Sequence, residues 1–503
     1  MSNKRFLVSL VFLITAFFSY GQHAHDKNCG VSVEDQLMSE ILHPNDFKGD
    51  ISSQRNNTIY VPVKFHLTAN DDGSGRLDYI HVLNQLCILN RDYASSNIVF
   101  YIYEGFSLIN QTNIYQEAGT NRNAVQAKKD GKAINVFITQ NADLDNNSSG
   151  GTTLGFYSPQ GDYVVIRKQE LASLSNTLSH EIGHFFNLRH TFYGWEGVPY
   201  NKQTHGERVT FTTVPGGIAN VLVELVDGSN CQTAADMICD TPPDYNFGLT
   251  SSNCAFNTVV FDKNNDRIFP MKENQMGYFQ DCDTFKFTEG QTDRMLINYN
   301  STSRNYLKST YIPNTTEITD APILNTPLKA EKLIGYTDVK FDWEDVPGTT
   351  TYLIEIKGSN QYYSALTTLS EYTAPELKKN NTYFWTVKPF NDGFGCSPVT
   401  TSNFRTGDGT SSTYDISEIK NIAIIPNPVN NSSTALISLF SNESDNAHIE
   451  VLSMVGQRLR TFTHSLEAGQ NTIPLDTEEL SNGVYMLNII VNGRNSFAKF
   501  MVH

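Results

Sequence analysis

The stretch that decides the fold of the first domain reads Thr177-Leu-Ser-His-Glu-Ile-Gly-His-Phe-Phe-Asn-Leu-Arg-His190. It contains two histidines four residues apart, His180 and His184, and residues at this spacing lie on the same face of a helix. Their imidazole nitrogens can therefore bind one metal ion, with the carboxylate of Glu181 beside it. The pattern predicts a helix, starting near Leu171, that presents a metal centre.

A third histidine, His190, follows the predicted helix. A continuous helix would carry His190 away from the ion, so the chain has to turn after about Phe186. Asn187 is at the required position, and asparagine tolerates a left-handed backbone better than most residues that carry a side chain. A lone helix histidine is more often solvated or internally bonded than a ligand, but three histidines at this spacing favour a metal site.

Length and composition limit what the whole chain can be. Its 503 residues exceed the size of one domain, and about two to four domains are expected. Hydrophobic residues make up 39%, which is enough for buried cores, and the net charge is −16. This acidity argues against nucleic acid or an anionic membrane as a partner, and its simplest meaning is a soluble secreted protein.

The N-terminus predicts a secretory signal peptide over residues 1–21. A basic start, Met-Ser-Asn-Lys-Arg, precedes an apolar run from Phe6 to Phe18 and the small residues of Ser19-Tyr-Gly21. The run is too short for a stable membrane anchor, and no later stretch is long and apolar enough to be one. We expect cleavage near Gly21–Gln22.

Seven cysteines are present, and in an exported protein they can form disulfides. Four of them cluster in one segment, Cys231, Cys239, Cys254 and Cys282. Four cysteines allow three pairings, and we favour Cys231–Cys254 with Cys239–Cys282. Cys87 lies in an apolar helical pattern and is predicted to be a small buried residue.

Residues 22–55 are polar and are predicted to form a propeptide. They contain Cys29, which glycine follows, and a thiolate is a good zinc ligand. Cys29 could fill the fourth coordination position of the metal and keep an enzyme latent; the alternative is an unpaired cysteine in a mobile tail. The polar stretch from Gln54 to Asn57 is where such a propeptide could be cut.

Residues 56–310 are predicted to form the metal-binding domain, with an α+β fold. Apolar residues at helical spacing predict a helix from Leu77 to Tyr93, and Thr288 is a plausible N-cap for a later one. Apolar or alternating runs predict strands at residues 59–67, 98–103, 133–139, 155–157 and 163–167. The segment after His190 is dominated by loops and turns.

Two features downstream bear on the metal centre. Asn274-Gln-Met-Gly-Tyr278 places a methionine and a tyrosine two residues apart. Met276 alone would be assigned to the core, but together with the histidines it can support the metal, and Tyr278 can reach the reacting centre. The acidic loops 239–244 and 262–266 are candidates for calcium, although solvated turns have the same composition.

These motifs together resemble the pappalysin family of metzincin metallopeptidases, in particular the ulilysin and cytophagalysin type. The resemblance is carried by residues 180–192, Gly228-Ser-Asn-Cys231, Ile238-Cys-Asp-Thr-Pro242, residues 274–278 and Phe287-Thr-Glu-Gly-Gln291. It implies a zinc endopeptidase with a mixed upper sheet, an irregular lower half and structural calcium. Asn28-Cys-Gly30 is similar to the cysteine switch of the bacterial proforms, whereas Asn187 replaces the glycine that the family has at this turn.

Two further domains follow a linker at residues 311–322. Strand patterns at residues 323–407 resemble a fibronectin type III sandwich, with Trp343 in its core and Tyr383 near a tyrosine corner. Residues 418–503 are similar to the C-terminal sorting domain of the type IX secretion system, because of their Pro-Asn-Pro motif, central glycine turn and Gly-Val-Tyr strand. This implies the type IX machinery as a partner; an ordinary β-sandwich is the alternative.

The predicted reaction is peptide hydrolysis at a zinc ion held by the three histidines. Glu181 would act as general base, and Tyr278 would stabilise the developing oxyanion. The resemblance places Asp281 near the pocket for the residue after the scissile bond, where an acidic group would favour Arg or Lys. Two alternatives are a surface adhesion protein with a structural or silent metal site, and a zinc-dependent amidase acting on a non-protein substrate.

Overall fold

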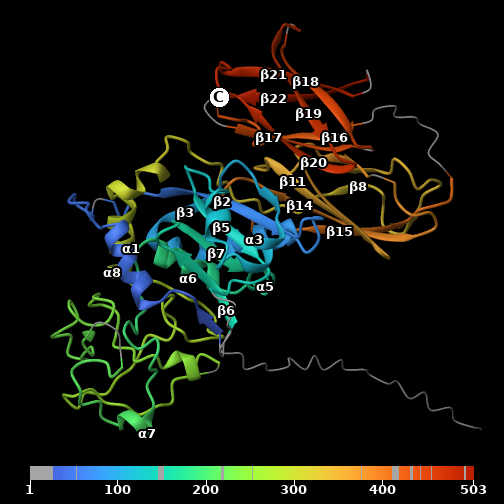
Figure 1. The fold of residues 1–503 in the computed structure, drawn as a ribbon. Coiled ribbons are helices and arrows are strands. Elements are labelled where there is room, and N and C mark those ends of the chain that lie inside the picture. Colours follow the sequence, from blue (N-terminus) through green and yellow to red (C-terminus); the bar gives the residue numbers. More distant parts are fainter. Residues whose placement is uncertain are drawn as a thin grey trace, which may run out of the picture.

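The computed structural model describes residues 27–52, 54–144, 152–216, 220–251, 253–374, 376–409, 419–430, 434–441, 443–454, 456–491 and 494–503. The predicted signal peptide and its cleavage point lie outside these residues. Within them, a mixed α/β domain is followed by two β-sandwiches (Figure 1). The upper part of the first domain is a sheet with helices, and its lower part, green in Figure 1, is mostly irregular.

A seven-stranded sheet forms the upper part of the first domain. Its strands are β1 (Lys27–Cys29), β2 (Ile59–Ala69), β3 (Ile98–Ile102), β4 (Ser107–Asn110), β5 (Ile134–Thr139), β6 (Thr152–Ser158) and β7 (Tyr163–Arg167). Their order is β1-β6-β7-β5-β2-β3, with β4 also beside β2, and only β6 and β7 pair antiparallel. The inner strands β2, β5 and β7 are buried along almost their whole length, which explains their continuous apolar runs.

Helices cover the sheet and lead into the irregular part. They are α1 (Val33–Leu42), α2 (Tyr79–Asp92), α3 (Thr112–Glu117), α4 (Arg122–Gln126), α5 (Lys168–Ala172), α6 (Thr177–Phe185), α7 (Lys202–His205) and α8 (Glu289–Tyr299), with 3-10 turns η1 (Ala94–Ser96), η3 (Gly248–Thr250) and η4 (Thr302–Leu307). The helix predicted to start near Leu171 is two helices, α5 and α6, because Leu174 has a left-handed backbone between them (φ 58°). The predicted N-cap of α8 is confirmed, since the Thr288 side chain accepts the Gln291 N–H in a capping box.

The irregular lower part has a core of its own. It is built from aromatic and aliphatic side chains, and in it Trp195 stacks on Tyr245 with ring centroids 4.8 Å apart. Two disulfides close its loops, and the favoured pairing is wrong: Cys231 bonds to Cys239, and Cys254 to Cys282. Two left-handed residues fold the chain back between the first pair, so these neighbours in sequence bring their Cα atoms to 4.9 Å, within disulfide range.

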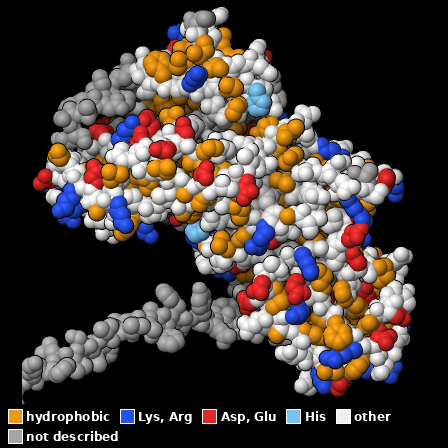
Figure 2. All heavy atoms as spheres, turned by 180° about the vertical axis from the view of Figure 1, so that it is seen from behind, with side chains coloured by type: hydrophobic (Ala, Val, Ile, Leu, Met, Phe, Trp, Pro, Cys, Tyr) orange, Lys and Arg blue, Asp and Glu red, His pale blue; other side chains and the backbone are white. Residues whose placement is uncertain are grey.

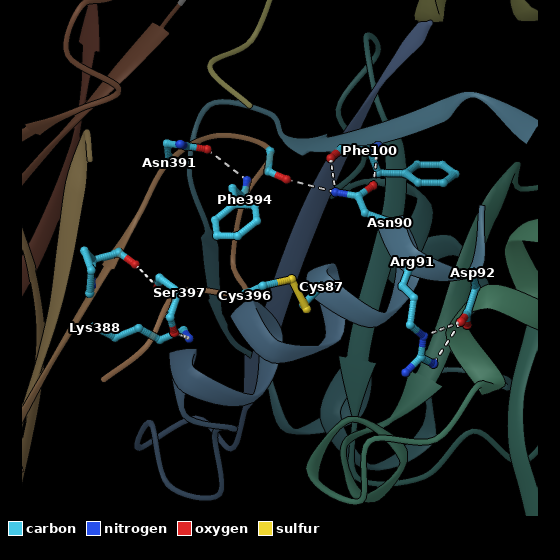
Figure 3. Close-up of a disulfide and its surroundings, with 12 residues drawn as sticks. Cys87, Asn90, Arg91, Asp92, Phe100, Lys388, Asn391, Phe394, Cys396 and Ser397 are labelled. Atoms are coloured by element: carbon cyan, nitrogen blue, oxygen red, sulfur yellow. Dashed lines mark hydrogen bonds and ion pairs between the residues drawn. A yellow bond between two sulfur atoms is a disulfide. The ribbon is translucent and has the colours of Figure 1, made fainter. Parts of the chain in front are cut away.

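Cys87, predicted to be a small buried residue, is half-buried and disulfide-bonded. Cys87, on α2, forms a disulfide with Cys396 in the first sandwich (Figure 3). One turn later on α2, Asn90 donates a hydrogen bond to the Gly393 carbonyl at 2.9 Å and accepts one from the Phe100 N–H at 2.7 Å. The first sandwich is therefore attached to the α/β domain by a covalent bond and by the neighbouring hydrogen bond from Asn90 to Gly393, while the Phe100 bond holds Asn90 in place within the α/β domain.

The first sandwich packs a sheet β13-β10-β8 against a sheet β12-β11-β14-β15-β9. Its strands are β8 (Leu324–Thr326), β9 (Glu331–Lys332), β10 (Lys340–Trp343), β11 (Thr351–Gly358), β12 (Gln361–Thr367), β13 (Glu371–Thr373), β14 (Thr382–Phe390) and β15 (Thr400–Arg405). Trp343 is buried in its core, as predicted. The Lys378 N–H donates to the Tyr383 hydroxyl at 2.8 Å, the upstream backbone bond that a tyrosine corner makes.

The second sandwich pairs a sheet β16-β17-β20 with a sheet β19-β18-β21-β22. Its strands are β16 (Ile419–Ile425), β17 (Thr434–Ser441), β18 (Asp445–Ser453), β19 (Arg458–Leu466), β20 (Gly469–Asp476), β21 (Gly483–Val491) and β22 (Arg494–Val502). Acidic and basic side chains are interspersed on the face of the molecule shown in Figure 2, so the net negative charge is not concentrated there. Among the described helices, none is long and apolar enough to span a membrane.

Candidate metal centre

The turn after α6 returns the chain to the face of the helix that carries the first two histidines. Asn187 has φ 63°, and the Leu188 N–H donates back to the Gly183 carbonyl at 3.0 Å. Such a bond, together with a left-handed residue, is a typical helix C-terminus. His190 is thereby brought beside His180 and His184.

The three histidines point their Nε2 atoms at one another. The Nε2–Nε2 distances are 3.2 Å from His180 to His184, 3.2 Å from His180 to His190 and 3.1 Å from His184 to His190. The Nδ1 atoms of His180 and His184 lie 2.7 and 2.8 Å from the carbonyl oxygens of Gln275 and Leu188. A carbonyl only accepts hydrogen bonds, so these Nδ1 atoms carry the proton and the Nε2 atoms present lone pairs.

This arrangement fits a cation. Converging lone pairs repel one another, and a zinc ion bound at tetrahedral angles holds its nitrogen ligands roughly 3.3 Å apart. Burial lowers the pKa of all three histidines, for His180 to about 4. The imidazoles are therefore neutral, which is the form that binds a metal.

Cys29 lies at the same point. Its Sγ and one nitrogen of each histidine all lie within 4.8 Å of one another. The chain reaches this position because β1 adds to the sheet edge beside β6, with Cys29 opposite Gly155 and the Gly30 N–H donating to the Gly155 carbonyl at 2.8 Å. Cys29 is the only cysteine of the seven that forms no disulfide.

Glu181 is buried beside the histidines. Neither carboxylate oxygen has a hydrogen-bond partner in the described part of the chain, and burial raises the pKa of Glu181 to about 8. A bound cation would lower that pKa again, because a nearby positive charge favours the carboxylate. Gly155 leaves room for this side chain, since a Cβ there would lie 3.2 Å from Glu181 Cγ.

The segment with the predicted methionine and tyrosine packs against the centre. Met276 is fully buried against Gly183 of α6, where a Cβ would collide with the Met276 sulfur. The ring of Tyr278 lies 5.1 Å from that of His190 and 6.0 Å from that of His180, between centroids. Both predicted residues therefore neighbour the histidines.

A cleft of about 620 Å³ opens beside Glu181. One wall follows the connection from α5 to α6, and the other follows residues 277–285. Asp281, the predicted pocket residue, lines this cleft together with the carboxylates of Glu170 and Asp283. Acidic side chains thus outnumber the one basic lining residue, Arg91.

The two acidic loops differ in what their carboxylates do. Asp262 accepts the N–H groups of Val226, Asn264 and Asp266 at 2.9–3.0 Å, so its carboxylate stabilises a turn. In the other loop Asp244 is buried, and burial raises its pKa to about 6.

Two further buried carboxylates near Asp244 were not predicted, because acidic residues in irregular chain form no recognisable pattern. Burial raises the pKa of Asp236 to about 7. For Glu224, burial and the charges of Asp236 and Asp244 raise it to about 9.

Two further residues around His190, Glu196 and Gln36, were not predicted from the sequence. The His190 Nδ1 lies 3.3 Å from a carboxylate oxygen of Glu196, and the His190 N–H donates to Gln36 of α1 at 3.0 Å. Neither partner belongs to the histidine motif. Both were visible in the sequence only as isolated polar residues.

Three histidines, an adjacent buried glutamate and a methionine packed against the helix make up the kind of centre that mononuclear zinc hydrolases have. Residues 121–299 match the family described as pregnancy-associated plasma protein-A, and residues 423–503 match the secretion system C-terminal sorting domain. The chain therefore carries a pappalysin-type metallopeptidase domain and a sorting domain of the type IX system, and the sorting domain indicates that the protein is secreted.

The individual relatives have low sequence identity to this chain. An extracellular metalloprotease of Verticillium alfalfae is 28% identical over 189 residues, which cover 33% of this chain and 65% of the relative. Among solved structures, dimeric latent PorU from Porphyromonas gingivalis is 15% identical with a TM-score of 0.22, covering 37% of this chain and 20% of its own. Chicken CNTN1 FN1–FN3 domains are 12% identical with a TM-score of 0.16, covering 37% and 68%.

Proposed function

We propose that the protein is a secreted zinc-dependent metalloendopeptidase of the metzincin type, made in a latent form. The observation that carries the proposal is the pairing of three converging Nε2 atoms with a buried carboxylate, Glu181, that has no hydrogen-bond partner among the described residues. An unpartnered buried carboxylate is costly, and such a cost is typical of functional sites.

The three histidines would hold the metal, and the chain's other residues would act on the peptide. A bound zinc ion supplies Lewis acidity, which lowers the pKa of water and polarises the scissile carbonyl. Glu181 would take the proton from the attacking water on its carboxylate and give it to the leaving amine nitrogen. The hydroxyl of Tyr278 would donate a hydrogen bond to the oxygen that becomes negatively charged.

Cys29 also bears on the alternative that the metal site is purely structural. Structural zinc is usually closed by four protein ligands, and Cys29 with three histidines makes such a set. However, Cys29 precedes the predicted cut near Arg55, so its removal would open one coordination position. A structural site would also have no use for Glu181, and for both reasons we favour a latent enzyme.

The cleft supports a preference for a basic residue after the scissile bond. Asp281, Glu170 and Asp283 line it, and their negative charge would attract Arg or Lys. The substrates proposed are therefore proteins or peptides with a basic side chain at that position.

We also propose a structural calcium ion near Glu224, Asp236 and Asp244. Burial raises the pKa of all three carboxylates, and the charges of Asp236 and Asp244 further raise that of Glu224, so a nearby cation would favour their ionised forms. If calcium binds there, the melting temperature of the zinc-loaded protein rises with calcium and falls with a calcium-selective chelator. No shift in either direction would refute this site.

The decisive experiment is a digestion. The full chain, cut at the propeptide, is incubated with casein or gelatin, with and without a zinc chelator. We expect hydrolysis that the chelator abolishes and added zinc restores. Intact casein and gelatin after quantitative zinc loading would refute the proposed activity and leave the adhesion or amidase readings.

A further inference from the structure

Helix α1 contacts the metal-binding loop at several points besides Cys29. We propose that the turn between the second and third histidines, together with α8, is a binding site for an amphipathic helix, and that Asn187 and Arg189 recognise α1 there. The site rests on the proposed function only in that α1 is part of a propeptide. Its occupant is the segment from Val33 to His43 of this chain.

Asn187 uses both ends of its side-chain amide on this segment. Its Oδ1 accepts a hydrogen bond from the hydroxyl of Ser39, and its Nδ2 donates to the His43 carbonyl at 2.6 Å. Ser39 and Asn187 are both buried. Glycine would adopt the left-handed turn with less strain, but it could make neither bond. The asparagine is therefore explained by what it binds and not by the turn alone.

Arg189 supplies the charge of the site. It donates two hydrogen bonds to the carboxylate of Glu40, at 2.9 and 2.8 Å, and its own side chain is only 5% exposed. Arg294 of α8 approaches the same carboxylate at 3.4 Å. Paired bonds of this kind fix orientation as well as adding affinity.

The contact reaches the third histidine itself. The side-chain oxygen of Gln36 on α1 accepts a hydrogen bond from the backbone N–H of His190 at 3.0 Å, and the Gln36 amide nitrogen donates to the Glu196 carboxylate at 3.2 Å. The space between α1 and the loop is almost filled, with a remaining cavity of only about 10 Å³. This is the packing of a specific interface, since poorly fitted surfaces leave voids.

Docking of α1 holds the cysteine in place. Cys29 precedes the first residue of α1 by four positions, and the Ser32–Asp35 capping box fixes the start of the helix. A tethered group next to a docked helix has a high effective concentration at its own site. Loss of the α1 contacts should therefore expose the Cys29 thiol even though the sulfur and the histidines are unchanged.

The test uses the full chain carrying Glu181→Gln, loaded with zinc, so that no proteolysis intervenes. The readout is the rate at which iodoacetamide alkylates Cys29, because the other six cysteines are in disulfides. We expect Ser39→Ala, Glu40→Gln and Asn187→Gly each to raise this rate by about tenfold, the effect of losing one good hydrogen bond or charged pair.

The matched control is Glu34→Gln, which removes a carboxylate from the exposed side of the same helix and should leave the rate within about twofold. Because Ser39 and Asn187 share a hydrogen bond, the double variant Ser39→Ala with Asn187→Gly should be alkylated at Cys29 little faster than Asn187→Gly alone. Zinc content and melting temperature show that each variant is folded.

Wild-type alkylation rates in Glu40→Gln and Asn187→Gly would overturn the proposal. Equal acceleration by Glu34→Gln would also overturn it, since this would show a general weakening of the helix. The readout needs no catalytic activity, so a chain that digests no protein would refute the proposed function while still testing this site.

Discussion

Glu181 is the residue on which the proposed chemistry depends most. Its side chain is completely buried, one position after a histidine whose Nε2 faces two others. Glutamine has the same shape but cannot take up a proton. Because Glu181 is not among the four residues whose ligand atoms converge, its replacement should spare metal binding.

We expect Glu181→Gln to bind one zinc ion per chain and to hydrolyse casein about 10²–10⁴-fold more slowly, the usual contribution of a general base. The measurement is initial rate at equal zinc content, by metal analysis of the same samples. Substantial residual turnover would assign the base to another group.

Asp281 tests the proposed preference for basic side chains. Asp281→Asn should reduce kcat/KM for peptides with Arg or Lys after the scissile bond by about tenfold, the effect of losing one charge pair, and should leave peptides with Leu there nearly unchanged. Asp72→Asn, which removes an exposed carboxylate that does not line the cleft, is the matched control and should change neither class of peptide. Equal losses for basic and apolar peptides would mean that Asp281 acts through structure.

Among the elements, η4 joins three parts of the α/β domain through one side chain. Arg304 is completely buried, and it donates to Asp162 at 2.5 Å, to the Phe185 carbonyl at the end of α6 at 2.5 Å, and to Asn298 of α8 at 3.1 Å. Burial is the largest single influence on the pKa of Asp162 and raises it, but the charges of Arg304 and His43 and the hydrogen bonds from Tyr306 and Arg304 together lower it by more, so the net pKa lies below the ordinary value. The carboxylate is thus a structural link to the metal helix.

Replacing Asp162 should lower the stability of the protein. Asp162→Asn leaves the buried Arg304 charge without its partner, and we expect a loss of about 3–5 kcal/mol in the free energy of unfolding. A group whose folded pKa is depressed stabilises the protein above its ordinary pKa and ceases to do so as pH falls through the folded value. The wild type should therefore lose stability from about pH 4 downward, and Asp162→Asn should show a weaker acid dependence.

Denaturant unfolding between pH 3 and 7 measures both effects. Asp50→Asn, which removes an exposed carboxylate with a local serine partner, is the control and should have little effect on stability. Identical acid slopes for wild type and Asp162→Asn would show that other groups cause the acid sensitivity.

The whole molecule depends on a bond between domains. Cys87–Cys396 closes a sequence separation of 309 residues, whereas Cys231–Cys239 closes one of 8. The hydrophobic core of the first domain also includes Leu353, Leu366 and Phe390 of the first sandwich. The two domains are therefore expected to unfold together.

Removing the bond should uncouple them. The double variant Cys87→Ala with Cys396→Ala should lose about 2–4 kcal/mol and split a shared calorimetric transition in two. The Cys231–Cys239 disulfide closes a much shorter loop. Its removal in the double variant Cys231→Ala with Cys239→Ala should therefore lower stability less, without splitting that transition. A single unchanged transition in the first variant would show that apolar contacts alone couple the domains.

Local features of the sequence determined the centre and its scaffold. The histidine spacing, the turn at Asn187, the helix over residues 79–92, the N-cap Thr288 and the predicted strand segments all follow from neighbours in the chain, because helix and strand periodicity and capping act over a few residues. The order of these strands within the sheet does not follow from such local patterns. The break at Leu174 was missed because leucine gives no sign of a left-handed backbone.

Only the tertiary structure decided which distant residues meet. The partner of Cys87, the carboxylates beside Asp244 and the docking of α1 on Asn187 each join segments whose sequences say nothing about one another. The pairing of Cys231 with its near neighbour Cys239 was also one of three that the sequence allowed. Closing a long loop costs little more than closing a moderate one. Many partners are therefore nearly equivalent for an isolated residue, and the packing of the whole fold selects among them.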